Sequence, residues 1–311
     1  MALSASDLEL LTKFERGLDP QHPERSTIPA RILGYGEIST VFEIDADGLR
    51  DFAFKRLPLF YNANEVEKYT TVHAEYNRLL ENEIGIRLPS HDCAIVSNST
   101  GRPIVYIIQK KLPAAAIGNR TIHTLAHDQI LTLVKRVLHE LNKVWEFNRR
   151  QTRAQVGIDG QISNWVIDSN DESLLYVDTS TPLFRIDQVE QLDTELFLRS
   201  APSFLVWILR WLFLKDVVNR YYDFRLVAVD LVANFYKEQK PELIPDVIQV
   251  VNDFFSSLNI QSITEKQVND YYKEDALIWS LYFNMRRVDR FLHTRILRKE
   301  YPYILPGKIK R

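Results

Sequence analysis

The spacing of apolar residues changes twice within the first third of the chain, and this pattern limits its possible folds most strongly. In residues 65–84 the apolar side chains recur every three or four positions, which predicts a helix with one apolar face. Strand-like stretches lie on both sides of this helix, and turn sequences such as "DADG" and "NSTG" join them. The expected strands are "ARILGYGE", "STVFEIDADG", "DFAFKRLPLF", "DCAIVS" and "RPIVYIIQKKL".

The remainder of the chain is mainly helical in its spacing. An apolar stripe begins after Asp128, "SNWVIDSNDESLLYVD" predicts a short hairpin, and nearly everything beyond residue 186 has a helical period. The run "FLVWILRWLFL" at 204–214 is shorter than the roughly 20 residues of a membrane span, so we expect a buried helix there. We therefore predict an α+β protein with a small β-rich N-terminal lobe, residues 1–112, and a larger helical C-terminal lobe, residues 113–311.

Composition argues against several classes of function. The net charge of −2 gives no overall attraction to nucleic acid, so we expect no nucleic-acid partner. A single cysteine, Cys93, excludes an internal disulfide framework and fits a reducing, cytoplasmic environment. Acidic residues interrupt the N-terminal apolar stretch, which does not resemble a signal peptide. It predicts an amphipathic helix that begins with a capping box of Ser6 and Glu9.

Two of only ten glycines, Gly34 and Gly36, lie between the first two predicted strands. Dinucleotide-binding folds place such glycines between a strand and a helix, and a Walker loop would continue with GK[ST], so neither fits. In "GYGEISTV" the two glycines and Val41 have the spacing of the protein-kinase loop G-x-G-x-x-G-x-V, with Ser39 at the third glycine. An ordinary β-turn is the alternative interpretation.

Lys55 ends the strand "FAFK", 14 residues after Val41. A lysine in so apolar a strand is costly unless it has an anionic partner. Glu75 follows 20 residues later, next to Tyr76 on the predicted helix, and could form that pair. The pair would hold the ammonium where it can bind nucleotide phosphates. Alternatively, Lys55 extends to solvent and Glu75 is an ordinary surface acid.

The third motif lies in "VGIDGQISNWVID", where Asp159 and Asn164 have the D-x-x-x-x-N spacing of a kinase catalytic loop. Asp178 follows an apolar strand, 14 residues after Asn164. Asp159 would accept or orient the proton of an attacking hydroxyl, and the other two would offer hard oxygen ligands to Mg²⁺. The interpretation requires Lys55 and Asp178 to meet in one cleft.

In combination, these motifs resemble those of the protein kinase-like superfamily, which includes protein kinases and phosphotransferases of the aminoglycoside and choline kinase type. The resemblance covers residues 33–180 and implies a bilobal fold with ATP and Mg²⁺ between the lobes. It implies Asp159 as the catalytic base and Asn164 and Asp178 as metal ligands. The residues that it places around the nucleotide are Gly34, Gly36, Val41, Ala53, Lys55, Glu75, Gln109, Lys110 and Lys111.

Several positions depart from the kinase pattern. Gly157 stands where the catalytic-loop histidine is expected, and Thr179 and Ser180 replace the Phe-Gly of the DFG motif. Gln161 replaces a lysine that neutralises the transferring phosphoryl group, an effect worth several kcal/mol. Arginines just upstream could compensate, namely Arg149, Arg150 and Arg153. "SAPS" at 200–203 lacks the glutamate of the APE motif, and we interpret it as a chance match.

The sequence thus predicts an ATP- and Mg²⁺-dependent phosphotransferase. Its expected partners are the nucleotide and an unidentified acceptor, either a small-molecule hydroxyl or a protein, without a membrane span. The departures leave a second interpretation open: a pseudokinase that binds nucleotide or a partner without transferring phosphate.

Overall fold

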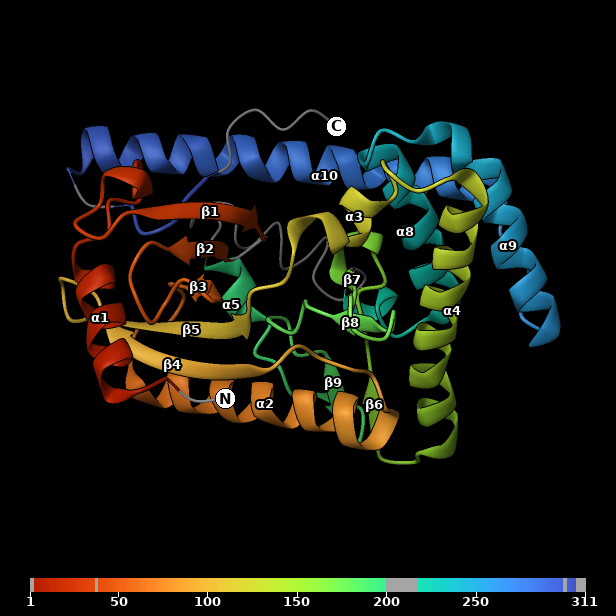
Figure 1. Ribbon diagram of the computed structural model, residues 1–311, viewed down its shortest axis with the longest axis horizontal. Helices are drawn as coiled ribbons and strands as arrows, with labels where there is room; N and C mark the ends of the chain where they lie inside the picture. Colours follow the sequence, from red (N-terminus) through yellow and green to blue (C-terminus); the bar gives the residue numbers. More distant parts are fainter. Residues whose placement is uncertain (1–2, 37–38, 200–217, 299–300, 306–311) are drawn as a thin grey trace.

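The structure, a computed structural model, describes residues 3–36, 39–199, 218–298 and 301–305. It is a mixed fold of helices and antiparallel strands. The largest sheet lies in the half of the molecule that holds the N-terminus, and several long helices fill the other half (Figure 1). The predicted segments 200–203 and 204–214 lie outside the described residues. No helix in the described ranges combines the length and the apolar character needed to cross a membrane.

The large sheet is antiparallel and has the strand order β1-β2-β3-β5-β4. The helix α2 (Ala63–Arg78) follows β3 and precedes β4, and it continues as a π-helical turn to Ile84. The predicted order of three strands, one helix and two strands is therefore confirmed. The strands are β1 (Ala30–Tyr35), β2 (Thr40–Ile44), β3 (Phe52–Leu57), β4 (His91–Ser97) and β5 (Pro103–Lys110).

Apolar residues are buried on both faces of this sheet, as its inner strand β5 shows. Tyr106 and Ile108 pack on one face with Phe14 of α1 (Ala5–Arg16). Val105 and Ile107 face the other way and pack with residues of α2. The alternation follows from the two-residue period of a strand. The sheet is thus held between α1 and α2, and α2 covers the face on which Lys55 lies.

The N-terminal helix begins two residues earlier than the sequence predicted. Ser4 is the N-cap: its hydroxyl accepts the amide of Asp7, and the Asp7 carboxylate accepts the amide of Ser4. The expected capping box of Ser6 and Glu9 is therefore wrong. Both pairs have the same Ser-x-x-acid spacing, but starting at Ala5 adds residues to the helix and lets the Ser6 hydroxyl bond to that of Ser4.

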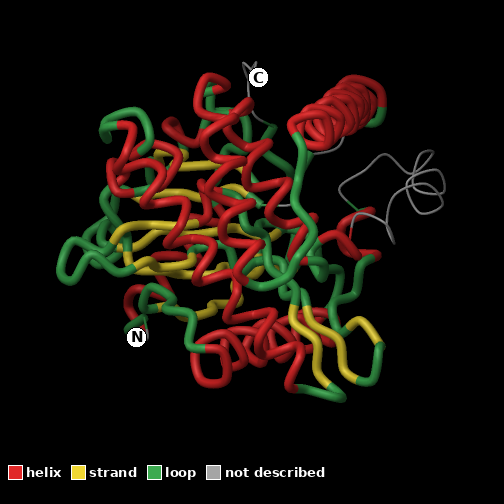
Figure 2. The backbone as a smooth tube through the Cα atoms, turned by 90° about the vertical axis from the view of Figure 1, so that its right-hand side faces the viewer, coloured by secondary structure: helices red, strands yellow, loops and turns green. Residues whose placement is uncertain are grey.

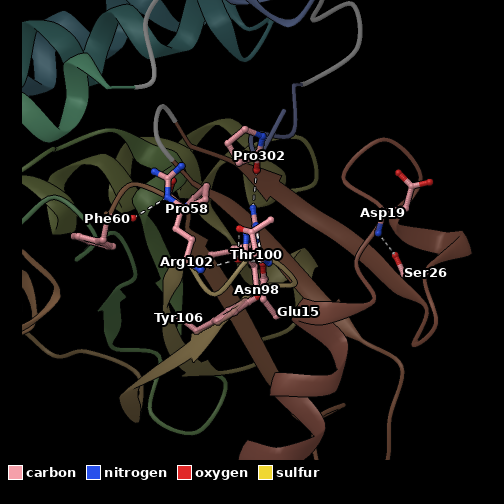
Figure 3. Close-up of polar contacts among 11 residues, drawn as sticks. Glu15, Asp19, Ser26, Pro58, Phe60, Asn98, Thr100, Arg102, Tyr106 and Pro302 are labelled. Carbon is pink, nitrogen blue, oxygen red and sulfur yellow. Dashed lines mark hydrogen bonds and ion pairs between the residues drawn. The ribbon is translucent and has the colours of Figure 1, made fainter. Parts of the chain in front are cut away.

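A buried ion pair ties α1, β3 and β5 together. The Arg56 guanidinium donates two hydrogen bonds of 2.8 and 2.7 Å to the Glu15 carboxylate, to which the Tyr106 hydroxyl also donates. A third bond of 2.8 Å goes from Arg56 to the carbonyl of Pro302, near the C-terminus. Figure 3 shows Glu15, Tyr106 and Pro302 gathered at this point. Both charged side chains are almost completely buried, so each depends on the other.

The other half of the molecule contains a second apolar core, formed mainly by long helices. Helix α8 is buried along most of its length, whereas α10 has many exposed residues. Among the described residues, the helical period predicted after residue 186 is largely confirmed, although the short strand β10 (Val189–Glu190) interrupts it. The helices are α3 (Gly118–Thr121), α4 (His127–Arg150), α5 (Glu195–Leu198), α8 (Phe224–Lys237), α9 (Ile244–Ser257) and α10 (Glu265–Phe291).

Two small sheets lie between α4 and α5 in the sequence. The predicted hairpin is confirmed as β7 (Trp165–Ile167) paired with β8 (Leu174–Tyr176). A three-stranded sheet contains β6 (Ala154–Val156), β9 (Phe184–Ile186) and β10 (Val189–Glu190), and Figure 2 shows it apart from the large sheet. The two small sheets hold the loops that carry Asp159 and Asp178.

The buried ion pair gives a test of this packing. Replacing Glu15 by Ala leaves the Arg56 charge buried without its carboxylate, which should lower the free energy of unfolding by about 3–5 kcal/mol. Urea denaturation followed by circular dichroism measures this change. Asp45→Ala, in the exposed pair with Arg50, is the control and should change the stability little. Equal effects of the two substitutions would contradict the structural role of the buried pair.

Candidate functional site

Lys55 and Asp178 meet at the centre of the candidate site, although 123 positions separate them in the sequence. The Lys55 ammonium donates to the Asp178 carboxylate at 2.7 Å and to the Ser180 hydroxyl at 3.1 Å. Lys55 lies on β3 between Val41 and Ile107 of the neighbouring strands. Asp178 follows β8 by two residues. The convergence that the sequence interpretation required is present.

The electrostatics of this pair keep Asp178 charged. Burial acts to raise the pKa of Asp178, but the Lys55 ammonium and the Ser180 hydroxyl outweigh it and hold that pKa below its usual value. The side chains of Lys55 and Asp178 are 16% and 27% exposed, so the pair is partly buried. The site therefore holds a charged carboxylate beside an ammonium at the edge of the protein interior.

The loop that carries Asp178 is fastened to α2. The Tyr69 hydroxyl donates to the carbonyl of Ser180 at 2.8 Å, and the ring of His73 forms a hydrogen bond of 3.2 Å with the Thr179 hydroxyl. Burial lowers the pKa of His73 to about 3, so this imidazole is neutral at physiological pH. Tyr69 and His73 are functional candidates that the sequence interpretation missed. Their four-residue spacing on the apolar face of a helix was the available signal.

The predicted ion pair between Lys55 and Glu75 is not formed. The Glu75 carboxylate instead accepts a hydrogen bond of 2.9 Å from the guanidinium of Arg78, and the Glu75 side chain is 41% exposed. Tyr69, His73 and Tyr76 occupy the buried face of α2, and Glu75 lies two positions from His73, about 200° around the helix. Glu75 is thus a surface acid, and the expected role beside the nucleotide phosphates does not apply to it.

Asp159 and Asn164 belong to one tight loop next to Asp178. The Asp159 carboxylate accepts the amide of Gln161 at 3.0 Å, and the backbone carbonyl of Asn164 accepts the amide of Val177 at 2.9 Å. Burial, followed by the charges of Asp230 and Asp178, raises the pKa of Asp159. The structure therefore brings Lys55, Asp159, Asn164 and Asp178 together, as the motif spacing predicted.

The side chain of Gln161 is anchored by one face of α8. Its amide nitrogen donates to the Asp230 carboxylate at 3.2 Å, and its amide oxygen accepts the Lys237 ammonium at 3.0 Å. Asn234, between these two on the helix, also donates to that oxygen at 3.4 Å. Sequence reasoning missed all three. The signal was polar residues at four- and three-residue spacing inside the apolar stretch "LVAVDLVANFYK".

The arginines proposed as substitutes for a catalytic-loop lysine lie elsewhere. Arg153 is 74% exposed and pairs with Asp187 at 2.9 Å. Arg150 is 77% exposed and pairs with Glu146 at 3.4 Å on the same helix, and Arg149 is also exposed. Compensation by these residues was a wrong expectation, because the end of α4 and the turn before β6 direct them to the surface.

Packing explains why glycine replaces the catalytic-loop histidine. A Cβ atom on Gly157 would lie 3.1 Å from the carbonyl oxygen of Tyr221 and 3.2 Å from the ring of Tyr222. The Tyr76 hydroxyl donates to the carbonyl of Gly157 at 3.0 Å. The space of a larger side chain is therefore filled, and α2 holds the loop directly.

The glycines of the first hairpin differ in what surrounds them. Gly34 lies at an irregular point of the β1–β2 register, and a Cβ atom added there would meet none of the described residues within 4 Å. Gly36 donates its amide to the Ser39 carbonyl at 3.0 Å, and its Cβ would lie 2.5 Å from the Ser39 hydroxyl. Gly36 thus has a local structural role in the turn, whereas the fold itself does not demand glycine at position 34.

Some of the residues expected around the adenine lie on the same face of the large sheet as Lys55. Val41 and Ala53 lie on the same face as Lys55, because they alternate with Phe42 and Phe54, which point to the α1 side. Gln109 pairs with Ala53 and donates its side-chain amide to the carbonyl of Val177 at 3.1 Å.

The backbone amides of Lys110 and Lys111 are already used. They donate to the carbonyls of Ser90 and Asp51, each at 2.8 Å. They are therefore not free to donate to a bound base.

A comparison with protein families identifies the chain's relatives. The model of a family of unknown function, DUF6206, matches residues 21–290. The chain belongs to this family. No curated protein matches it. The DUF6206 match spans the large sheet, the loops that carry Asp159 and Asp178, and α8. The residues of the site therefore all lie within the region that the family shares.

The fastening of the Asp178 loop to α2 can be tested. Tyr69→Phe removes the donor to the buried Ser180 carbonyl, which should lower the free energy of unfolding by about 1–3 kcal/mol. Amide hydrogen exchange at residues 178–182 should become faster, as mass spectrometry can measure. Tyr61→Phe, at an exposed tyrosine, is the control. Unchanged exchange in the Tyr69 variant would show that this bond does not hold the loop.

Proposed function

We propose that this protein is an ATP- and Mg²⁺-dependent phosphotransferase with a bilobal protein kinase-like fold. The observation that carries the proposal is the 2.7 Å contact between Lys55 and Asp178. These residues come from two motifs that were matched to kinases independently. A kinase uses the first to bind the nucleotide phosphates and the second to hold Mg²⁺.

The arrangement of elements supports the proposed fold. A five-stranded antiparallel sheet with one helix between its third and fourth strands in the sequence agrees with the N-terminal lobe of a kinase, here residues 1–112. Residues 113–311 would form the second lobe. A third apolar cluster joins them, because it contains Val105 and Ile107 of the sheet together with Leu183 and Tyr222.

The donor set fits Mg²⁺ that arrives with a nucleotide. Mg²⁺ in proteins commonly takes one or two carboxylates and completes its octahedron with water and phosphate oxygens. Asp178 would supply a carboxylate and Asn164 an amide oxygen. Within the described residues, no group of three or more His, Cys, Asp or Glu side chains could hold a metal by itself. A bound Mg²⁺ would neutralise and orient the phosphates.

The residues around the metal loop have separate proposed roles. Lys55 would bind phosphate oxygens while keeping Asp178 charged. Gly34 would leave room for the phosphates, since none of the described residues restricts its Cβ position. Asp159 would accept or orient the proton of the acceptor hydroxyl.

We propose a small-molecule hydroxyl as the acceptor, because the sequence lacks several motifs that protein kinases carry after the metal loop. A protein acceptor is the alternative. Two observations favour a second function, a pseudokinase that acts as an interaction module: Glu75 does not pair with Lys55, and the amides of Lys110 and Lys111 are occupied.

Nucleotide binding is the first test. Mg·ATP at a hundred times its Kd should stabilise the protein by about 2.7 kcal/mol, which a thermal-shift assay detects as a higher Tm. Asp178→Ala should lose the Mg²⁺-dependent part of this shift because it removes a metal ligand. Asp187→Ala, which removes an exposed carboxylate outside the site, should keep it. If ATP with Mg²⁺ does not change the Tm of the wild-type protein, the proposed function is wrong.

Turnover separates the phosphotransferase from the pseudokinase. Asp159→Asn should keep the Mg·ATP thermal shift and lose phosphate release from labelled ATP, because the amide cannot accept the proton. Wild-type protein that binds Mg·ATP without releasing or transferring phosphate would favour the pseudokinase instead.

A further inference from the structure

We propose that Lys237 of α8 supplies the positive charge that the catalytic loop lacks at Gln161. This inference rests on the proposed phosphotransferase function. It assigns a catalytic role to a residue that lies 76 positions from Gln161 in the sequence and outside every motif matched to kinases.

The geometry places the Lys237 ammonium at the catalytic loop. Its nitrogen lies 3.0 Å from the side-chain oxygen of Gln161, and the backbone amide of Gln161 donates to the Asp159 carboxylate at 3.0 Å. A single residue thus separates the ammonium from the proposed base. The charge of Lys237 also acts to lower the pKa of Asp159, against the larger effect of burial.

The position of Lys237 is fixed by its helix. Asp230, Asn234 and Lys237 follow one another at four- and three-residue spacing, so they share one face of α8. All three contact the side chain of Gln161. Since α8 is buried along most of its length, this face cannot shift easily. Gln161 is therefore a positioning residue: it holds the ammonium of Lys237, which carries the charge.

Other cations near the site have different partners. Lys55 bonds to Asp178 and Ser180, on the sheet side of the site. The upstream arginines Arg150 and Arg153 pair with surface acids. Among the described residues, Lys237 is the cation that reaches Asp159 through the fewest hydrogen bonds. It bonds to Gln161, which in turn bonds to Asp159.

A cation at this place would stabilise the charge on the transferring phosphoryl group. In the transfer, the bond between the γ-phosphorus and its bridging oxygen breaks, and a bond from the acceptor oxygen to that phosphorus forms. ADP leaves with the electron pair of the broken bond, and Asp159 takes the acceptor's proton. An ammonium has three N–H donors, and Gln161 takes one. The remaining donors of Lys237 would stabilise the oxygens of the transferring group without exchanging a proton.

A binding experiment tests this without a known acceptor. Mg·ADP with aluminium fluoride mimics the transferring phosphoryl group, so it should raise the Tm of the wild-type protein more than Mg·ADP alone. Lys237→Met should keep the Mg·ADP shift and lose the additional shift. Lys240→Met is the matched control, since Lys240 lies three positions further on and pairs with Glu242. It should behave like the wild type.

Turnover provides a second readout, and a double variant that moves the lysine to position 161 provides a third. Phosphate release from Mg·ATP by Lys237→Met should fall by about 10²–10³-fold, as for the loss of one stabilising donor. The double variant Gln161→Lys, Lys237→Met returns the charge to the catalytic loop and should recover the aluminium fluoride shift. If Lys237→Met does not fold, Lys237→Gln keeps a polar contact with Gln161 and removes only the charge.

The outcomes distinguish the two proposals. If the wild-type protein binds no Mg·ADP, the proposed function fails and the role of Lys237 fails with it. If Mg·ADP binds but aluminium fluoride adds nothing, or adds the same shift in the Lys237 variants, only the role of Lys237 is refuted. Loss of the additional shift in the Lys237 variants, with the Lys240 control unaffected, supports it.

Discussion

The ion pair between Lys55 and Asp178 is the interaction on which the site depends. An ammonium on an apolar strand and a carboxylate in a partly buried loop each carry a desolvation cost, which they offset only together. The pair fixes the loop after β8 against the large sheet. It also places a carboxylate and an ammonium side by side in a partly buried setting, which is the combination that the proposed function requires for a metal-bound phosphate group.

The loops beside this pair are held by unusual anchors. Tyr69 and His73 fasten the Asp178 loop to α2, and α8 fastens the Asp159 loop through Gln161. Each anchor stands where the sequence departs from the kinase pattern. The departures at Thr179 and Gln161 therefore have a structural explanation, because these side chains bond to the anchoring residues. At Ser180 the anchor uses the backbone carbonyl, and the hydroxyl bonds to Lys55 and Asp178 instead.

Much of this arrangement could be predicted from the sequence, because it depends on local patterns. The two-residue and 3.6-residue periods of apolar residues predicted the strands and α2. The spacing of the motifs predicted that Lys55 and Asp178 would meet. The Lys55–Glu75 pair was wrong because an error of one or two positions turns a helical side chain by 100–200°. Asp230 and Lys237 were missed because their partner, Gln161, is distant in the sequence, and no local pattern shows which loop a polar helix face will contact.

The most direct measurement is a crystal structure of the protein with a non-hydrolysable ATP analogue and Mn²⁺ in place of Mg²⁺. Anomalous scattering locates the metal without ambiguity. The proposed site predicts a manganese peak bound by Asn164 and Asp178, with a phosphate oxygen beside the Lys55 ammonium. Nucleotide or manganese bound elsewhere, with the contact between Lys55 and Asp178 undisturbed, would contradict it.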